Sequence, residues 1–308
     1  PARATEAAWW QGVLRRADPV LGTRALDPAK DTYATARHLA MTLPVSVTEA
    51  VLTRVPAAFN AEVNDVLLAA FTLAWTRWRA GSGDGLLLDL EGHGREEHLV
   101  EGADLSRTVG WFTNLYPVRL DAAVGDLADA FAGGPAAGAA VKEIKEQLRA
   151  VPDKGMGYGL ARYLNPATEA GFADLPAPQV AFNYLGRFTT AGTEGAGGAA
   201  IPDWTVLATA AGLGGTDPRV PLAHALELNA RTNDGPRGPE LTATWTWAKD
   251  ILAESGVREL ADLWFQALEA LAEHAERPDA GGLTVSDVSL ALLDQNEIEL
   301  LEDEWRTS

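Results

Sequence analysis

The chain has 308 residues, no cysteine and a formal net charge of −18 at pH 7. Nucleic acids and anionic membranes attract basic surfaces, so this charge argues against both as partners. Without cysteine there is no disulfide, no thiolate nucleophile and no cysteine-bound zinc. Hydrophobic residues make up 47% and charged residues 22%, which is typical of one large globular domain or two smaller ones.

The chain begins without a signal peptide or an initiator methionine. Its longest apolar stretch, residues 66–75, is too short to span a bilayer. We therefore expect a cytoplasmic protein that is cut from a longer polypeptide.

The first quarter of the chain predicts mostly helix. Residues 1–43 are expected to form a helix followed by an irregular or extended segment. Residues 47–55 predict a short helix that is entered at Ser46 and stopped by Pro56.

The strongest helical pattern covers residues 61–79, where apolar side chains recur at i, i+3, i+4 and i+7. Asn60 is expected to cap this helix and Gly81 to end it. The apolar run 86–90 that follows has the length and composition of a central strand.

The remainder of the chain mixes strands and helices. Strands are expected over 108–120 (broken near 114–117), 179–185, 222–230 and 241–247, helices over 138–149, 157–164 and 257–271, a loop over 190–200, and a short helix within the acidic segment 294–305. This mixture predicts an α/β (α+β) fold with one mixed sheet covered by helices.

A carboxylate follows the predicted strand 86–90. Residues 91–96 read Glu-Gly-His-Gly-Arg-Glu, and the glycines would let a substrate approach the backbone. In an apolar crevice the pKa of Glu91 would rise, which suits a general base acting on a weak carbon acid. The alternative is a solvated glutamate paired with Arg95.

A second polar pair ends the strand near residue 185. Asn183 and Tyr184 can both donate hydrogen bonds to a developing oxyanion. The alternative is that Asn183 forms a turn before Gly186 and that Tyr184 belongs to the core. The five histidines show no metal-ligand pattern, and the glycines of residues 155–159 lack a preceding strand, so we predict neither a metal nor a dinucleotide site.

Together these segments resemble the epimerization domains of nonribosomal peptide synthetases, a branch of the condensation-domain superfamily. The resemblance covers roughly residues 1–275 and rests on segments in matching order: 64–68, 91–96, 105–113, 151–159 and 182–186. Condensation domains share the fold, but the Glu-Gly-His-Gly-Arg-Glu and Gly-Tyr-Gly elements favour epimerization.

One part of the family pattern is absent. The family's activity is associated with a His-His-x-x-x-Asp-Gly motif, and this chain has no His-His pair. The resemblance therefore implies a chloramphenicol acetyltransferase-like lobe. Residues 1–43 would be the end of the front lobe and the crossover segment, 44–279 the C-terminal lobe and 280–308 an acidic linker.

The resemblance implies inversion at Cα of an aminoacyl or peptidyl thioester. The thioester would be carried on the phosphopantetheine arm of a peptidyl carrier domain, with no cofactor bound by the chain itself. Glu91, Asn183 and Tyr184 would be catalytic. His93, Arg95 and Trp111 would contact the substrate or shape its tunnel. Expected partners are the carrier domain, adjacent synthetase domains and the domain's own front lobe.

Three alternatives stay open at this point. The chain could be a condensation-type domain that forms peptide bonds, or a non-catalytic docking platform. It could also be a fragment that is inert without the missing histidine motif.

Overall fold

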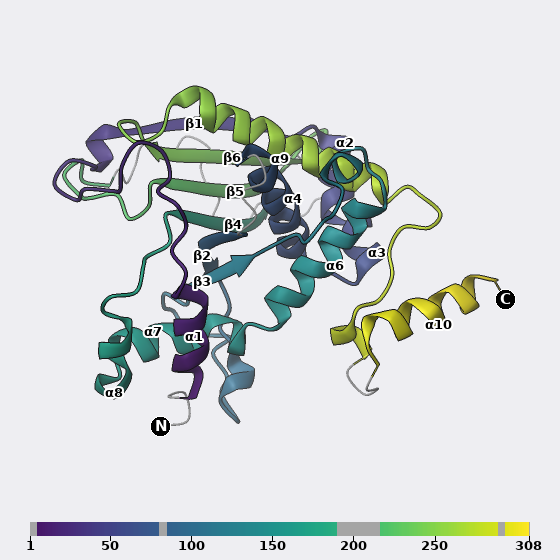
Figure 1. The fold of residues 1–308 in the computed structure, drawn as a ribbon, viewed down its shortest axis with the longest axis horizontal. Helices are drawn as coiled ribbons and strands as arrows, with labels where there is room; N and C mark the ends of the chain where they lie inside the picture. Colours follow the sequence, from purple (N-terminus) through teal and green to yellow (C-terminus); the bar gives the residue numbers. More distant parts are fainter. Residues whose placement is uncertain (1–4, 80–84, 190–215, 289–292, 308) are drawn as a thin grey trace, which may run out of the picture.

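The fold is built on a mixed sheet. The computed structural model describes residues 5–79, 85–189, 216–288 and 293–307. Within them, six strands follow the order β1-β6-β5-β4-β2-β3 (Figure 1). The strands are β1 (Ala36–Thr42), β2 (Leu86–Gly92), β3 (Asn114–Leu120), β4 (Val180–Thr189), β5 (Leu226–Gly235) and β6 (Gly238–Ala248). β4 runs parallel to β2 and β5, and the other pairs are antiparallel. The α/β prediction with a mixed sheet is confirmed.

Helices pack against this sheet. They are α1 (Ala7–Leu14), α2 (Val45–Leu52), α3 (Arg54–Phe59), α4 (Val63–Trp78), α5 (Leu127–Phe131), α6 (Pro135–Arg149), α7 (Met156–Tyr163), α8 (Pro166–Glu169), α9 (Glu254–His274) and α10 (Gln295–Thr307). α1, α7 and α8 lie next to the edge strand β3, and α10 lies apart from them near the C-terminus (Figure 1). None of the described helices is long and apolar enough to cross a membrane.

The centre of the core is where α4 meets the sheet. The Phe71 ring of α4 lies 6.0 Å from Phe182 of β4 and 5.9 Å from Trp245 of β6, centroid to centroid. Trp245 in turn meets Trp264 of α9 edge-on at 5.9 Å, and the Trp264 indole N–H donates to the carbonyl of Leu67. Each such buried aromatic contributes about 2–3 kcal/mol of burial energy, so this cluster fixes α4 and α9 on one face of the sheet.

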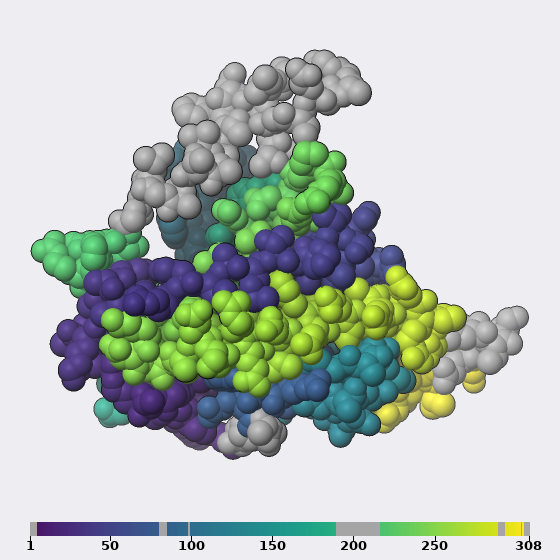
Figure 2. Space-filling view, turned by 90° about the horizontal axis from the view of Figure 1, so that it is seen from above, coloured from purple at the N-terminus to yellow at the C-terminus, as the bar shows by residue number. Residues whose placement is uncertain are grey.

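The opposite face of the sheet is polar. Along β5, Leu226, Leu228 and Ala230 are buried, whereas the alternating residues Glu227 and Asn229 are only partly covered. Side chains alternate across a strand, so the apolar residues of β5 share one face of the sheet and its polar residues share the other. Helices pack on the apolar face, and the polar face stays accessible. Seen from above, the yellow-green surface of α9 runs beside the purple surface of the N-terminal segment that contains β1 (Figure 2).

Several predicted boundaries were wrong. Asn60 does not cap α4: it has a φ of 47° and closes α3, and Glu62 and Asp65 form the capping box of α4 instead. Pro56 lies inside α3 and does not stop a helix, because the first turn needs no amide donor there.

The strand predictions also needed correction. Residues 36–42, expected only as irregular or extended chain, form β1, which pairs with β6. Residues 114–120 form one unbroken strand and 108–113 form none. β3 tolerates Pro117 because it is an edge strand. The loop predicted over 190–200 lies outside the described residues.

The helices expected over 61–79, 138–149, 157–164 and 257–271 are confirmed as α4, α6, α7 and α9.

Candidate active site

The parallel pair β2 and β4 places the predicted site residues next to each other. Leu90 pairs with Phe182, and both side chains are buried in the core. Glu91 and Asn183 come one residue later on each strand, so both face the polar side of the sheet. Strands that run parallel bring such residues to the same end of a sheet, which is a favoured position for a site.

His93 connects these two strands. Its Nε2 lies 2.7 Å from Asn183 Oδ1 and 3.9 Å from Glu91 Oε2. Because the amide oxygen only accepts, the His93 Nε2–H donates to it, and Nδ1 accepts from the Thr113 hydroxyl at 3.3 Å. The structure therefore brings three of the predicted site residues, Glu91, His93 and Asn183, into one polar group.

Glu91 lies where two pockets meet. A pocket of about 310 Å³ is lined by Glu91, His93 and Tyr184 together with the ends of α4 and α6. A second pocket of about 350 Å³, on the polar face of the sheet, is lined by Glu91 and Asn183. Asn183 and Tyr184, neighbours in sequence, thus line different pockets, and Glu91 is common to both.

The Glu91 carboxyl is electrostatically suited to accept a proton. Its side chain is 34% exposed. Burial raises the pKa of Glu91 above its ordinary value; His93 and His224 oppose the rise, and Glu227 adds to it. A carboxylate with a raised pKa is a stronger general base at neutral pH.

Tyr184 keeps its proton at neutral pH. Burial raises the pKa of its phenol, whose oxygen lies 3.0 Å from the Thr232 hydroxyl oxygen. Tyr184 is partly buried between the core and the first pocket.

Arg95 and Trp111 lie outside both pockets. The Arg95 guanidinium donates to the carbonyls of Leu105 and Thr108, each at 2.6 Å, and stacks 4.3 Å from the centroid of the Phe112 ring. Arg95 therefore holds the following loop rather than pairing with Glu91. Trp111 is 90% exposed. Substrate contact by these two residues stays a prediction.

The first pocket also contains an unsatisfied acceptor. Asn64 lines it, and Asn64 Oδ1 is a buried side-chain atom without a hydrogen-bond partner among the described residues. A buried acceptor without a partner is rare in a folded protein, because most buried polar groups are hydrogen-bonded. Within the same described ranges, no group of three or more histidine, aspartate or glutamate side chains is arranged to hold a metal ion.

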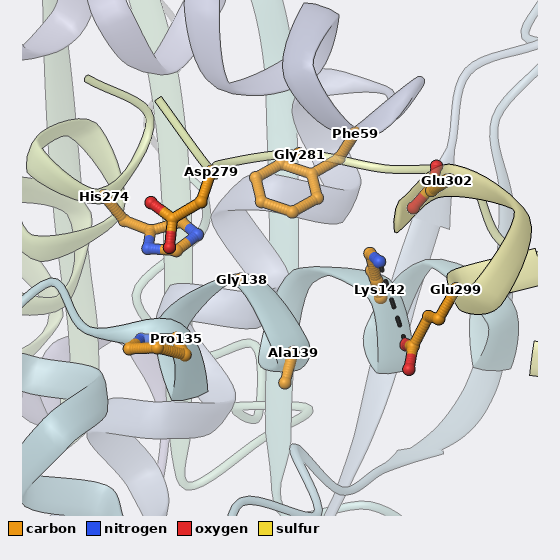
Figure 3. A pocket seen from close by; sticks show the side chains of 10 residues that line it. All are labelled: Phe59, Pro135, Gly138, Ala139, Lys142, His274, Asp279, Gly281, Glu299 and Glu302. Atoms are coloured by element: carbon orange, nitrogen blue, oxygen red, sulfur yellow. Dashed lines mark ion pairs between the residues drawn. The ribbon is translucent and has the colours of Figure 1, made fainter. Parts of the chain in front are cut away.

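A separate pocket lies between α6 and α10 (Figure 3). Its lining includes Phe59, Lys142, His274 and Glu302 and shares no residue with the two pockets at Glu91. It forms where the C-terminal tail meets the body of the fold, so it is not part of the candidate active site.

Comparison with known proteins identifies the family. A family model described as the condensation domain matches residues 1–293. The chain belongs to the condensation-domain family. This confirms the superfamily resemblance that the sequence motifs indicated.

Relatives of this condensation-family chain are synthase proteins that are much longer than the chain. A linear gramicidin synthase protein from Brevibacillus parabrevis is 38% identical over 277 residues, which cover 88% of this chain and 5% of that protein. Gramicidin S synthase 1 from Brevibacillus brevis is 31% identical over 309 residues, covering 97% of this chain and 26% of that protein. The chain thus spans a small part of the length of these relatives.

Solved structures show the same fold. The epimerization domain from the third module of tyrocidine synthetase B has a TM-score of 0.68 and 29% identity, and the match covers 89% of this chain and 56% of that one. The X-domain from teicoplanin biosynthesis has a TM-score of 0.56 at 18% identity, with 90% of this chain and 56% of that one covered, which shows the fold alone.

Sequence reasoning missed one polar cluster beside the candidate active site of this condensation-family chain. Asp89, His224 and Glu227 form a hydrogen-bonded group on the same sheet face as Glu91. The five histidines, His224 among them, show no metal-ligand pattern in the sequence, so the sequence alone gives His224 no distinguishing role. One signal was present: Asp89 precedes Glu91 by two residues and so shares its face of the strand.

Proposed function

We propose that this condensation-family chain is the C-terminal lobe of an epimerization domain. It would invert Cα of an aminoacyl or peptidyl thioester carried on the phosphopantetheine arm of a carrier domain. The observation that carries the proposal is the half-buried Glu91 carboxylate at the junction of two pockets. The Glu-Gly-His-Gly-Arg-Glu motif and the 29% identity to a solved epimerization domain support it.

In the proposed reaction Glu91 removes the proton from Cα. The electron pair of the C–H bond moves into the thioester carbonyl and forms an enolate. Reprotonation from the opposite face inverts the centre. The second acid would come from the front lobe, where the family's His-His-x-x-x-Asp-Gly motif is found. The raised pKa of Glu91 favours the first step because it strengthens the base.

The neighbouring groups would position the substrate. The Asn183 amide carries two N–H donors and lines the pocket on the polar sheet face, where it can orient the thioester carbonyl. His93 fixes that amide through the 2.7 Å hydrogen bond to its oxygen. Asn64 Oδ1 would accept an N–H from an amide of the substrate or of the phosphopantetheine arm.

Exchange of the substrate Cα proton tests the proposal. The two-lobed domain of the parent polypeptide would be mixed with an aminoacyl carrier in D₂O, and deuterium at Cα would be measured by mass spectrometry. Glu91→Gln should slow exchange by about 10²–10⁴-fold, the usual contribution of a general base. The control Glu101→Gln changes an exposed glutamate outside both pockets and should leave exchange unchanged.

The same assay separates the alternatives. Near-normal exchange in Glu91→Gln would remove Glu91 from the mechanism. A longer peptide from two loaded carriers, without Cα exchange, would identify a condensation domain. If the unaltered two-lobed domain shows neither Cα exchange nor peptide-bond formation, the domain is a non-catalytic docking platform.

A further inference from the structure

A buried histidine is held between two carboxylates beside the candidate base. His224 Nε2 lies 2.9 Å from Asp89 Oδ2, and His224 Nδ1 lies 3.4 Å from Glu227 Oε1. The side chains of His224, Asp89 and Glu227 are only 8%, 13% and 18% exposed, respectively. Because both ring nitrogens face acceptors, both donate, and the imidazole is held as an imidazolium.

This cluster belongs to the same cavity as Glu91. The pocket of about 350 Å³ on the polar sheet face is lined by Glu91, Asn183, His224 and Glu227. Asp89 is two residues before Glu91 on β2 and faces the same side. The cluster of Asp89, His224 and Glu227 joins β2 to the segment that leads into β5, across the intervening strand β4.

We propose that His224 is a positioning residue for Glu91: clamped by Asp89 and Glu227, it is a fixed cation that, together with the Glu227 carboxylate, sets the proton affinity of Glu91. This inference rests on the proposed function, because it assigns the groups that tune the proposed base.

The charges act in opposite directions. The His224 cation favours the ionised form of Glu91, whereas the Glu227 carboxylate disfavours it. The His224 imidazolium stays charged through the neutral pH range, because Asp89 and Glu227 stabilise its protonated form. The opposing effects of His224 and Glu227 on Glu91 are therefore constant over that range. Further titratable groups line the two pockets: Tyr33 from the segment before β1, His93 and Glu96 from the loop after β2, Glu62 and Asp65 from the start of α4, Tyr116 from β3, Arg149 and Lys154 from α6 and the segment after it, and Tyr184 from β4.

The test compares two substitutions with opposite expected effects. His224→Gln removes the cation, so the pKa of Glu91 should rise. Glu227→Gln removes the anion, so the pKa of Glu91 should fall. Each shift should be about 0.5–1 pH unit for a charge that lines the same partly solvated pocket as Glu91. The carboxyl ¹³C chemical shift of Glu91, followed against pH in the full chain, reports the pKa directly.

Activity gives a second, independent readout. In the two-lobed domain, the acid limb of the pH–rate profile for Cα exchange should move to higher pH in His224→Gln and to lower pH in Glu227→Gln. The control His38→Gln alters a histidine of β1 that lines neither pocket, and it should move neither readout.

The outcomes distinguish the two proposals. Shifts of the Glu91 ¹³C titration in the same direction, or none, would overturn the role of His224. If one variant does not fold, the direction of the other still decides. If the pKa of Glu91 moves in opposite directions in the two variants but the pH–rate profile of Cα exchange does not move, the effect of His224 and Glu227 on Glu91 is confirmed. Glu91 would then not be the base.

Discussion

Lys145 and Asp287 form a buried ion pair that fastens the C-terminal tail to α6. The Lys145 Nζ lies 2.5 Å from Asp287 Oδ2, and the side chains are 0% and 7% exposed. Lys145 also donates to the carbonyl of Phe59 at 2.9 Å, and Asn60 donates to the second oxygen of Asp287 at 2.6 Å. A buried ammonium needs such partners, so this part of the tail completes the fold.

The neighbouring contacts extend this attachment. The Gly282 N–H donates to the carbonyl of Ala58, and the Ser286 hydroxyl donates to Glu146 at 2.6 Å. Figure 3 shows α10 facing α6 across the pocket, where Lys142 lies 3.9 Å from Glu299. Residues 281–288 are therefore held by several independent contacts to α3 and α6.

Loss of the Asp287 charge should destabilise the chain. Asp287→Asn leaves Lys145 as a buried, unpaired cation, and we expect the free energy of unfolding to fall by about 3–5 kcal/mol. Urea denaturation measures this change. The control Asp279→Asn affects a carboxylate that pairs with Arg277 at the surface, and it should change stability by less than about 1 kcal/mol.

A double substitution checks the reason for that loss. Lys145→Met with Asp287→Asn removes both charges and keeps a side-chain oxygen that can accept from Asn60 or Thr284, so it should recover most of the stability that Asp287→Asn alone loses. A double variant as unstable as the single one would contradict the explanation by an unpaired charge.

The His224 cluster should make stability depend on pH. Burial disfavours the imidazolium, but the hydrogen bonds from His224 to Asp89 and Glu227 outweigh it and raise the pKa of His224 from 6.5 to about 9. A raised pKa contributes stability that is complete below pH 6.5 and is lost as the pH rises through about 9. The loss should be about 3 kcal/mol.

Urea midpoints between about pH 6 and about pH 9.5 measure this effect. His224→Gln should flatten the decline, because the variant has no imidazole to titrate. His38→Gln should keep it. A decline of equal size in His224→Gln would assign the pH dependence to other groups.

The Asn183 amide should affect activity through His93 as well as through the substrate. Asn183→Ala removes the acceptor of the His93 Nε2–H, so the ring loses its fixed orientation beside Glu91. We expect Cα exchange in the two-lobed domain to fall by at least about tenfold, since a displacement of about 1 Å in an active site can lower the rate by about 10²-fold. The fold should be kept, as judged by a free energy of unfolding unchanged within about 1 kcal/mol.

Asn233→Ala is the matched control for this prediction. Asn233 lies on β5 and lines neither pocket at Glu91. It should retain full exchange. Equal losses in both variants would show that the effect is general to the sheet and not specific to His93.

Local patterns were sufficient for much of this fold. The apolar periodicity of residues 61–79 predicted α4 to within about two residues at each end, because a helix is specified by contacts three and four residues apart. The apolar run 86–90 likewise predicted β2 and placed Glu91 at its end. The strand β1 was not recognised, because its partner β6 lies about 200 residues further along the chain and only that pairing defines it.

The family motif, the acidic charge and Glu91 as the candidate base could be predicted from the sequence, since each depends on residues close together in the chain or on composition alone. Two contacts could be seen only in the folded chain: His224 meets Asp89 across 135 positions, and Lys145 meets Asp287 across 142. A buried charge is stable only when a partner reaches it in space, and that partner is set by strand order and helix packing rather than by sequence spacing.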